Sequence, residues 1–294
     1  MKISVWCRSA VLCAAATLGA TASSAQERPP LDPDAIRAVG TPDEPRDDWQ
    51  IQPGVGGFYS PNFVGSKDYQ LQAGPNVAVR YKDRFFVSVL DGVGFDLIKT
   101  DSFRAGPVVK FQQQRRENGK STFMIAGKRT TALLGMGDVD ATIEAGGYIR
   151  YQSGPFSANA EVRKGLGGHD GVIAEFGLRY TTPFAGLSVG DRPIILSVGP
   201  GATVVDSQYE ATYFSIDAGQ SLRTGLARFD AKGGLQSYGV NAVVVVPISP
   251  KLSAALIGGF DRLSGDAAKS PLVRERGSRN QKTLGLGLTY RFGL

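Results

Sequence analysis

The residues of this chain that are best suited to catalysis are its single histidine, His169, and the neighbouring Asp170. A histidine with an acid or a serine partner forms the centre of many acyl hydrolases and proteases. Here the pair lies in Gly167-Gly168-His169-Asp170-Gly171, and adjacent residues of an extended chain point to opposite sides. Such a glycine-rich stretch is typical of a tight strand connection. We therefore interpret His169 as a turn residue and predict that the protein is not an enzyme.

Metal and cofactor sites have little support. One histidine is too few for a histidine-based zinc site, and both cysteines, Cys7 and Cys13, lie close to the N-terminus. The glycine-rich runs at 135–137 and 165–168 lack the lysine and the serine or threonine of a phosphate loop, so we interpret them as turns. We predict no cofactor and no catalytic, cofactor-binding or metal-binding residues.

A basic segment precedes the last stretch of the chain and consists of Arg274, Arg276, Arg279 and Lys282. It can bind phosphates or sugars of lipopolysaccharide, or it can be an ordinary hydrated loop. We favour the hydrated loop, because clustered charges are common in loops.

The N-terminus has the parts of a secretory signal peptide. Lys2 and Arg8 form a short positive region, residues 11–20 are apolar, and Ser23-Ser24-Ala25 offers the small residues that a signal peptidase recognises. Residues 1–25 are therefore predicted to be a signal peptide. Its removal lowers the formal net charge from +6 to +4. The remaining basic residues are spread out, so no nucleic-acid partner is predicted.

Residues 26–48 differ in composition from the rest of the chain. They combine charged residues with five prolines, namely Pro29, Pro30, Pro33, Pro42 and Pro45. Such a segment buries too little surface to offset the entropy of ordering. We predict a flexible, proline-rich periplasmic linker. Since both cysteines leave with the signal peptide, the mature protein has no disulfide and depends on backbone pairing or a sizeable core.

From Trp49 onward, apolar and polar residues alternate with a period of two. The cleanest stretch places five apolar residues on one face: Leu284, Leu286, Leu288, Tyr290 and Phe292. Similar stretches occur at 69–81, 141–152, 156–163 and 172–180. In a β-strand, alternate residues lie on opposite faces. The alternation predicts an all-β domain over residues 49–294.

A soluble β-sandwich and a membrane barrel can both use this pattern. Three features favour the barrel. The segments run for about ten residues or more, enough to cross a bilayer when tilted. Aromatic residues such as Tyr69 and Tyr81 stand at segment ends, where interfacial girdles lie. The chain also closes on an alternating segment near Phe292. We predict an antiparallel transmembrane β-barrel of about 12 strands, within a range of about 10–14.

The segment 85–99 fits the alternation poorly, because Asp91 falls on the same face as Phe85 and Val87. A β-bulge near Gly92 and Gly94 would restore the phase. We therefore interpret this segment as a bulged strand.

Several segments, in the same order along the chain, resemble the MipA/OmpV family of outer-membrane proteins. They are Tyr59-Ser-Pro-Asn-Phe-Val-Gly-Ser66, Pro75 through Tyr81, Asp206-Ser-Gln-Tyr-Glu-Ala-Thr-Tyr-Phe-Ser215, Phe260-Asp-Arg-Leu-Ser-Gly-Asp-Ala-Ala-Lys-Ser-Pro-Leu-Val, Gly277-Ser-Arg-Asn-Gln-Lys and Thr289-Tyr-Arg-Phe292. Together they cover most of the predicted mature chain. No residue-level binding motif comes with the resemblance.

The resemblance implies a β-barrel in the bacterial outer membrane, surrounded by membrane lipid and lipopolysaccharide. Named members of the family are associated with scaffolding of a lytic transglycosylase and a murein synthase, or with surface adhesion. The function implied is that of a non-enzymatic scaffold or interaction protein. The partners implied are a lytic transglycosylase or a murein synthase.

A passive pore for small solutes is the alternative. The alternating segments place six charged residues where they would line a wet lumen: Glu144, Arg150, Glu161, Arg163, Glu175 and Arg179. Conductance in planar bilayers would distinguish a pore from a scaffold, which would instead retain murein enzymes on an affinity column.

Overall fold

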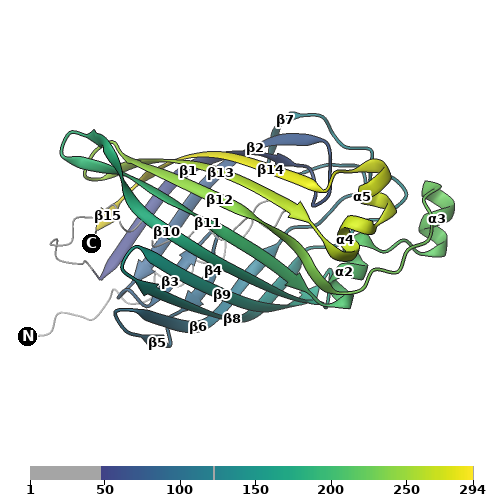
Figure 1. Cartoon of the computed structure of the whole chain (residues 1–294), viewed down its shortest axis with the longest axis horizontal. Helices are drawn as coiled ribbons and strands as arrows, with labels where there is room; N and C mark the ends of the chain where they lie inside the picture. Colours follow the sequence, from purple (N-terminus) through teal and green to yellow (C-terminus); the bar gives the residue numbers. More distant parts are fainter. Residues whose placement is uncertain (1–47, 122, 294) are drawn as a thin grey trace, which may run out of the picture.

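The computed structural model describes residues 48–121 and 123–293, which form a closed, antiparallel β-barrel of twelve wall strands (Figure 1). The fold and the strand number predicted from the sequence are confirmed. The predicted signal peptide, residues 1–25, and all but the last residue of the predicted linker, residues 26–48, lie outside the described residues. Within the described ranges, no helix is long and apolar enough to cross a membrane.

The wall strands follow one another in chain order. They are β1 (Trp49–Pro61), β2 (Tyr69–Tyr81), β3 (Phe85–Ser88), β4 (Gly92–Phe95), β6 (Phe103–Gln112), β8 (Thr142–Ser153), β9 (Phe156–Gly167), β10 (Val172–Val189), β11 (Arg192–Val205), β12 (Gly234–Pro247), β13 (Leu252–Leu263) and β14 (Asn280–Tyr290). Each pairs with the next, and the pairing of β1 with both β2 and β14 closes the barrel. Three short strands extend this circuit: β5 (Ile98–Lys99) along β6, β7 (Met124–Gly127) along β2, and β15 (Phe292–Gly293) along β1.

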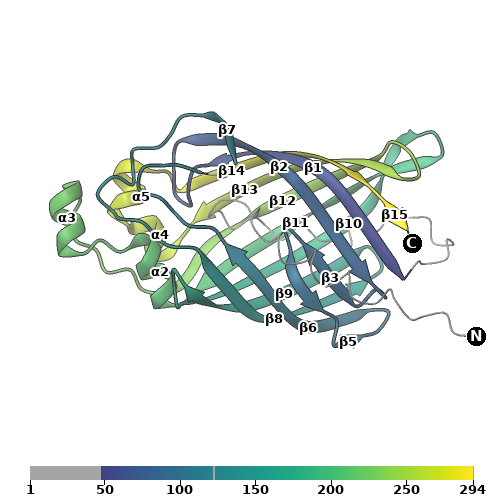
Figure 2. The ribbon, with the colours of Figure 1, turned by 180° about the vertical axis from the view of Figure 1, so that it is seen from behind.

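The two ends of the barrel differ in their connections. Tight connections, such as 154–155 and 190–191, lie at the end where the described chain begins and finishes, whereas the long connections 113–141, 206–233 and 264–279 lie at the other end (Figure 2). In outer-membrane barrels the short turns face the periplasm and the long loops face outward. The long-loop end is therefore the extracellular end.

Four short helices lie in the extracellular loops: α2 (Ser207–Phe214), α3 (Ala218–Thr224), α4 (Gly265–Lys269) and α5 (Pro271–Arg276). Asp206 caps α2 by accepting a hydrogen bond from the Tyr209 backbone N at 2.8 Å. Asp217 and Gln220 form a reciprocal capping box at the start of α3. The basic segment at 274–282, predicted to be a loop, instead runs from the end of α5 into β14, because Pro271 starts a helix there.

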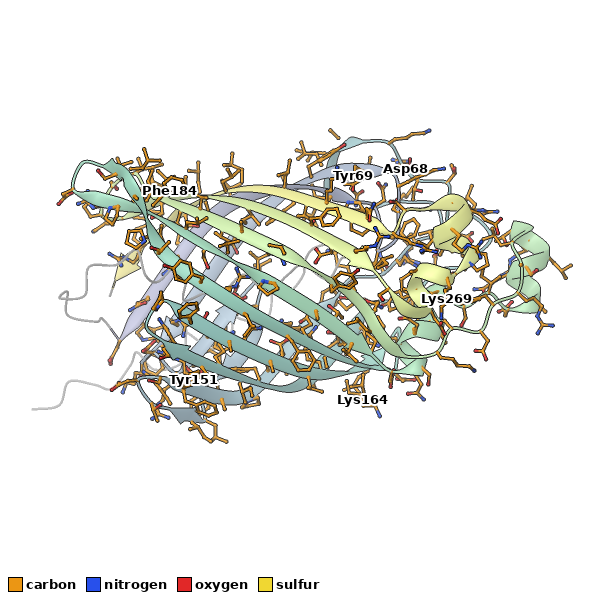
Figure 3. The ribbon with its side chains drawn as sticks, viewed as in Figure 1. Asp68, Tyr69, Tyr151, Lys164, Phe184 and Lys269 are labelled. Carbon is orange, nitrogen blue, oxygen red and sulfur yellow. The ribbon has the colours of Figure 1, made fainter. Side chains whose placement is uncertain are left out.

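The alternation of the sequence corresponds to an apolar outer face and a polar interior. On β14, Leu286 is 61% exposed on the outside, while Gln281 and Thr283 are buried inside. Aromatic pairs mark the two membrane levels: Trp49–Tyr81, Tyr290–Phe292 and Phe156–Tyr180 near the periplasmic end, and Tyr59–Tyr69 near the extracellular end, with ring centroids 4.4–5.2 Å apart. Figure 3 labels Tyr69 toward the extracellular end and Tyr151 toward the periplasmic end.

The interpretation of residues 85–99 as a bulged strand is wrong. The chain instead reverses around Val89–Asp91, where the Ser88 hydroxyl accepts hydrogen bonds from the backbone N of Leu90 and of Asp91. β3 and β4 therefore form a hairpin of two four-residue strands, with Ser88 paired to Gly92. Asp91 broke the alternation because it lies in a turn. The wall between β2 and β6 is consequently shorter than the rest.

Candidate functional site in the barrel interior

A cluster of paired charges lies on the inner face of four neighbouring strands and is centred on Arg163 of β9. Arg163 Nε donates to Glu144 Oε2 on β8 at 2.7 Å, and Nη1 donates to Glu175 Oε2 on β10 at 2.6 Å and to Glu161 on its own strand. Lys110 of β6 adds a second cation, with Nζ 2.6 Å from Glu161 Oε1. The Arg163 side chain is only 4% exposed. Because buried charges need partners, this cluster ties four neighbouring strands together.

His169 lies at the extracellular edge of this cluster and is buried. Its backbone N donates to Thr142 Oγ1 at 3.1 Å, and its Nε2 is 3.0 Å from Glu144 Oε1. The imidazole packs edge-on against the rings of Tyr209 and Tyr213 of α2, with centroids 4.8 and 5.8 Å away. The neighbouring Asp170 is exposed, as expected for residues that point in opposite directions. A ring enclosed in this way is closed to a substrate arriving from water.

A second charged cluster lies in the periplasmic half of the barrel. Arg104 donates to Asp96 Oδ2 at 2.9 Å and to Asp83 Oδ2 at 3.3 Å. Lys99 Nζ is 2.7 Å from Asp83 Oδ2, and the Tyr148 hydroxyl donates to Asp96 Oδ1 at 2.5 Å. The alternation does not reveal this cluster, because most of its residues come from 83–99, where a hairpin interrupts the period of two. The sequence does hold one signal for this cluster: the charged residues Asp83, Asp96 and Lys99, which an alternating strand does not explain.

The extracellular loops pack over the barrel mouth around two buried apolar clusters, here called the lid. One comprises Val139, Ile173, Val205, Tyr209, Tyr213, Phe214, Ala231, Leu263, Ala267, Ala268 and Val273, and the other comprises Phe63, Ala132, Leu133, Met136, Ile216, Leu226 and Leu272. These residues come from all the long loops, from residues 62–68 and from the adjoining strand ends. Each large apolar side chain buried in this way contributes about 1.5–3 kcal/mol. The lid is therefore a packed structure rather than a set of separate loops.

Polar contacts join the loops within the lid. The Ser270 hydroxyl donates to the Phe214 carbonyl at 2.7 Å, and Arg276 donates to the carbonyls of Ala132 and Thr224. Arg115 donates to the Tyr213 carbonyl at 2.8 Å and lies over the Tyr213 ring. Burial lowers the pKa of Arg115 to about 10, which leaves it charged at neutral pH.

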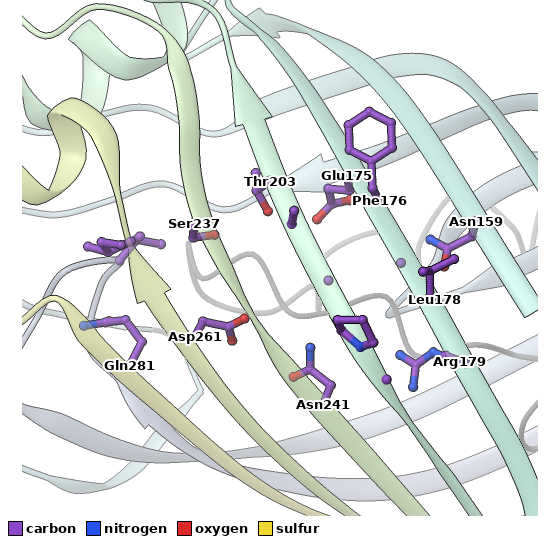
Figure 4. A pocket seen from close by; sticks show the side chains of 17 residues that line it. Asn159, Glu175, Phe176, Leu178, Arg179, Thr203, Ser237, Asn241, Asp261 and Gln281 are labelled. Atoms are coloured by element: carbon purple, nitrogen blue, oxygen red, sulfur yellow. The ribbon is translucent and has the colours of Figure 1, made fainter.

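Below the lid, a small cavity of about 60 Å³ remains between β9 and β14 (Figure 4). Polar side chains from several strands line it, including Asn159, Arg179, Thr203, Asn241 and Asp261. This volume holds a few water molecules. Together with the lid and the paired charges, it makes a wet but narrow interior on this side of the barrel.

The six charged residues predicted to face the lumen do so. Glu144, Glu161, Arg163, Glu175 and Arg179 are buried in the interior, and the Arg150 guanidinium stacks over the Tyr148 ring at 4.8 Å. What the sequence could not indicate is that Arg163 bonds directly to three of the others, namely Glu144, Glu161 and Glu175. The predicted turn at 135–137 is present, with positive φ at Gly135 and Gly137. The run at 165–168, also predicted to be a turn, instead lies mostly in β9, which ends at Gly167.

The family model described as MltA-interacting protein MipA matches residues 54–292. The chain belongs to the MipA family. This MipA-family barrel is a protein of the bacterial outer membrane, as the sequence predicted. No curated protein matches it.

Among solved structures, this MipA-family chain is similar to the NanC porin, with 9% identity over 81% of this chain and 98% of the porin at a TM-score of 0.42. It is also similar to an outer-membrane channel from Pseudomonas putida F1, with 10% identity over 86% of this chain and 100% of the channel at a TM-score of 0.41. OprD from Pseudomonas aeruginosa is 8% identical over 85% of this chain and 94% of OprD, at a TM-score of 0.31.

Proposed function

We propose that this protein is a non-enzymatic scaffold of the outer membrane that binds a murein-active enzyme in the periplasm and does not act as a passive pore. The observation that carries the proposal is the packed lid over the extracellular mouth. A passive pore needs a continuous water-filled path through the barrel. In this barrel the two apolar clusters of the lid lie across the extracellular mouth. The burial of His169 under α2 supports the non-enzymatic part.

The partner we propose is a lytic transglycosylase. The support is the description of the matching family as MltA-interacting proteins, because MltA is a lytic transglycosylase. The contact belongs at the periplasmic end, where murein lies and where both ends of the described chain emerge (Figure 2). Residues 26–48 directly precede β1 at this end, so we propose that this proline-rich segment takes part in the contact.

A pull-down on reconstituted protein tests the proposal. The mature chain in nanodiscs is immobilised and exposed to a purified periplasmic lytic transglycosylase, with empty nanodiscs as the control. We expect the full mature chain to retain the enzyme and a chain beginning at residue 49 to retain less. If nanodiscs with and without the protein retain equal amounts, the scaffold function is wrong.

A further inference from the structure

The short β3–β4 hairpin leaves the extracellular half of the wall between β2 and β6 without a full-length strand. β3 pairs with β2 only at residues 78–81, and β4 pairs with β6 only at Val93 and Gly94. Toward the extracellular end, β2 is instead joined at residues 70–72 by β7, a short strand from the loop 113–141. The loop therefore replaces the missing part of the wall, and the free edge of β7 faces away from β2 (Figure 2).

A cleft of about 710 Å³ lies in this loop, between β7 and the residues that follow β6. One side carries Arg116 and Lys120, the other carries Met124 and Ile125, and Arg129 lies beyond the end of β7. The cleft thus combines three basic side chains with apolar ones, and its volume is far larger than that of the cavity below the lid.

The charges of the cleft are not balanced within the protein. Arg116 Nη1 donates to Asp138 Oδ2 at 2.6 Å, and the other Asp138 oxygen accepts from the Glu117 backbone N at 2.8 Å. These hydrogen bonds lower the pKa of Asp138, which keeps this carboxylate ionised. Lys120 and Arg129 are exposed and have no ionic partner in the part of the chain that the structure describes. The cleft therefore keeps an excess of positive charge.

The cleft lies at the extracellular end of the wall, beside an aromatic pair of the kind that marks the membrane interface. β7 pairs with β2 next to Tyr69, which stacks on Tyr59 at the extracellular end of the wall. Ile125, on β7, is 64% exposed, and Phe111 near the end of β6 is also exposed. Exposed apolar side chains at and beside a basic cleft suit an amphipathic anion, because its phosphates need cations and its acyl chains need apolar surface.

We propose that this cleft binds the phosphate groups of an anionic glycolipid of the outer leaflet, whose acyl chains lie against Ile125 and Phe111. Arginine and lysine are the residues that bind phosphate most strongly, arginine through paired N–H donors and lysine as a point charge. The lipid therefore lies beside β7, where β3 and β4 are short.

The test measures binding of lipid A to the mature protein by native mass spectrometry, in detergent at low ionic strength. The variant Arg116→Gln/Lys120→Gln/Arg129→Gln removes the three cations of the cleft. A second variant, Lys120→Gln/Arg129→Gln, leaves the Arg116–Asp138 pair intact. The control Lys164→Gln/Arg228→Gln/Lys269→Gln removes three exposed cations elsewhere toward the same end of the barrel. Heat-dependent migration on gels establishes that each variant is folded.

We expect affinity for lipid A to fall on the order of tenfold or more in the triple variant and severalfold in the double variant, because hydrogen bonds to charged groups are lost. The control should bind like the unchanged protein, and dephosphorylated lipid A should bind weakly to all of them. Equal losses in the control and the cleft variants would overturn the proposal, as would equal binding of dephosphorylated lipid A. Displacement of lipid A by micromolar inorganic phosphate would also overturn it, because the site would then recognise a soluble ion.

Discussion

Replacing Arg163 with methionine tests how far the charged cluster stabilises the barrel. The substitution removes the cation that Glu144, Glu161 and Glu175 share and leaves Lys110 beside Glu161 and Glu175. Removing one partner of a buried ion pair typically lowers stability by about 3–5 kcal/mol, because the other charges stay buried. With a urea m value of about 3 kcal/mol/M, the unfolding midpoint should fall by about 1–1.7 M.

The measurement is urea unfolding in lipid vesicles, followed by tryptophan fluorescence. Lys164 provides a matched control, because it is the next residue on β9 and lies on the outer face, as Figure 3 shows. Lys164→Met should leave the midpoint unchanged or raise it, since it removes a charge from the exterior. If Arg163→Met and Lys164→Met unfold at the same urea concentration, the cluster does not stabilise the barrel.

Three further predictions concern the lid and the lipid-facing surface. Leu272→Ala, at a fully buried lid position, should destabilise the lid by about 2–5 kcal/mol, so limited proteolysis should cleave the extracellular loops faster while heat-dependent gel migration stays normal. Burial raises the pKa of Glu210 from an ordinary value of 4.5 to about 7. Between pH 4.5 and pH 7 the folded lid therefore holds a proton that the unfolded chain has lost, so the stability of the lid falls as the pH rises through this window. Proteolysis should be slower at pH 5 than at pH 8, and Glu210→Gln should remove the difference. Leu286→Lys, on the outer face, should lower stability in vesicles by about 2–4 kcal/mol, and an unchanged unfolding midpoint would mean that this face does not contact lipid.

The strands were predictable from the sequence because a membrane barrel imposes lipid on one face and water on the other. The stretch 69–81 was predicted as a strand and is β2, and the stretch 141–152 is nearly coextensive with β8. A period of two survives wherever both faces are constrained along the whole strand. The β3–β4 hairpin was misread because its turn lies partway along the wall and leaves only four residues on each side.

The interior site was only partly predictable. The inward direction of Glu144 and Arg163 follows from the alternation, but their contact depends on the register between β8 and β9, which places Arg163 opposite Gly146. The two-residue turn at 154–155 fixes that register, and the alternation alone does not give the exact bounds of the turn. The lid was missed for a similar reason: residues such as Phe63 and Leu272 come from loops far apart in the sequence, and irregular loops carry no periodicity.

Single-channel recording in planar bilayers tests the central claim most directly. The mature protein is inserted and recorded at neutral pH, with a known porin as the positive control for insertion. The packed lid predicts a silent bilayer, in contrast to stepwise conductance from the porin. Regular conductance steps from the unchanged protein would mean that the lid leaves a wet path, and the passive pore would then replace the scaffold as its function.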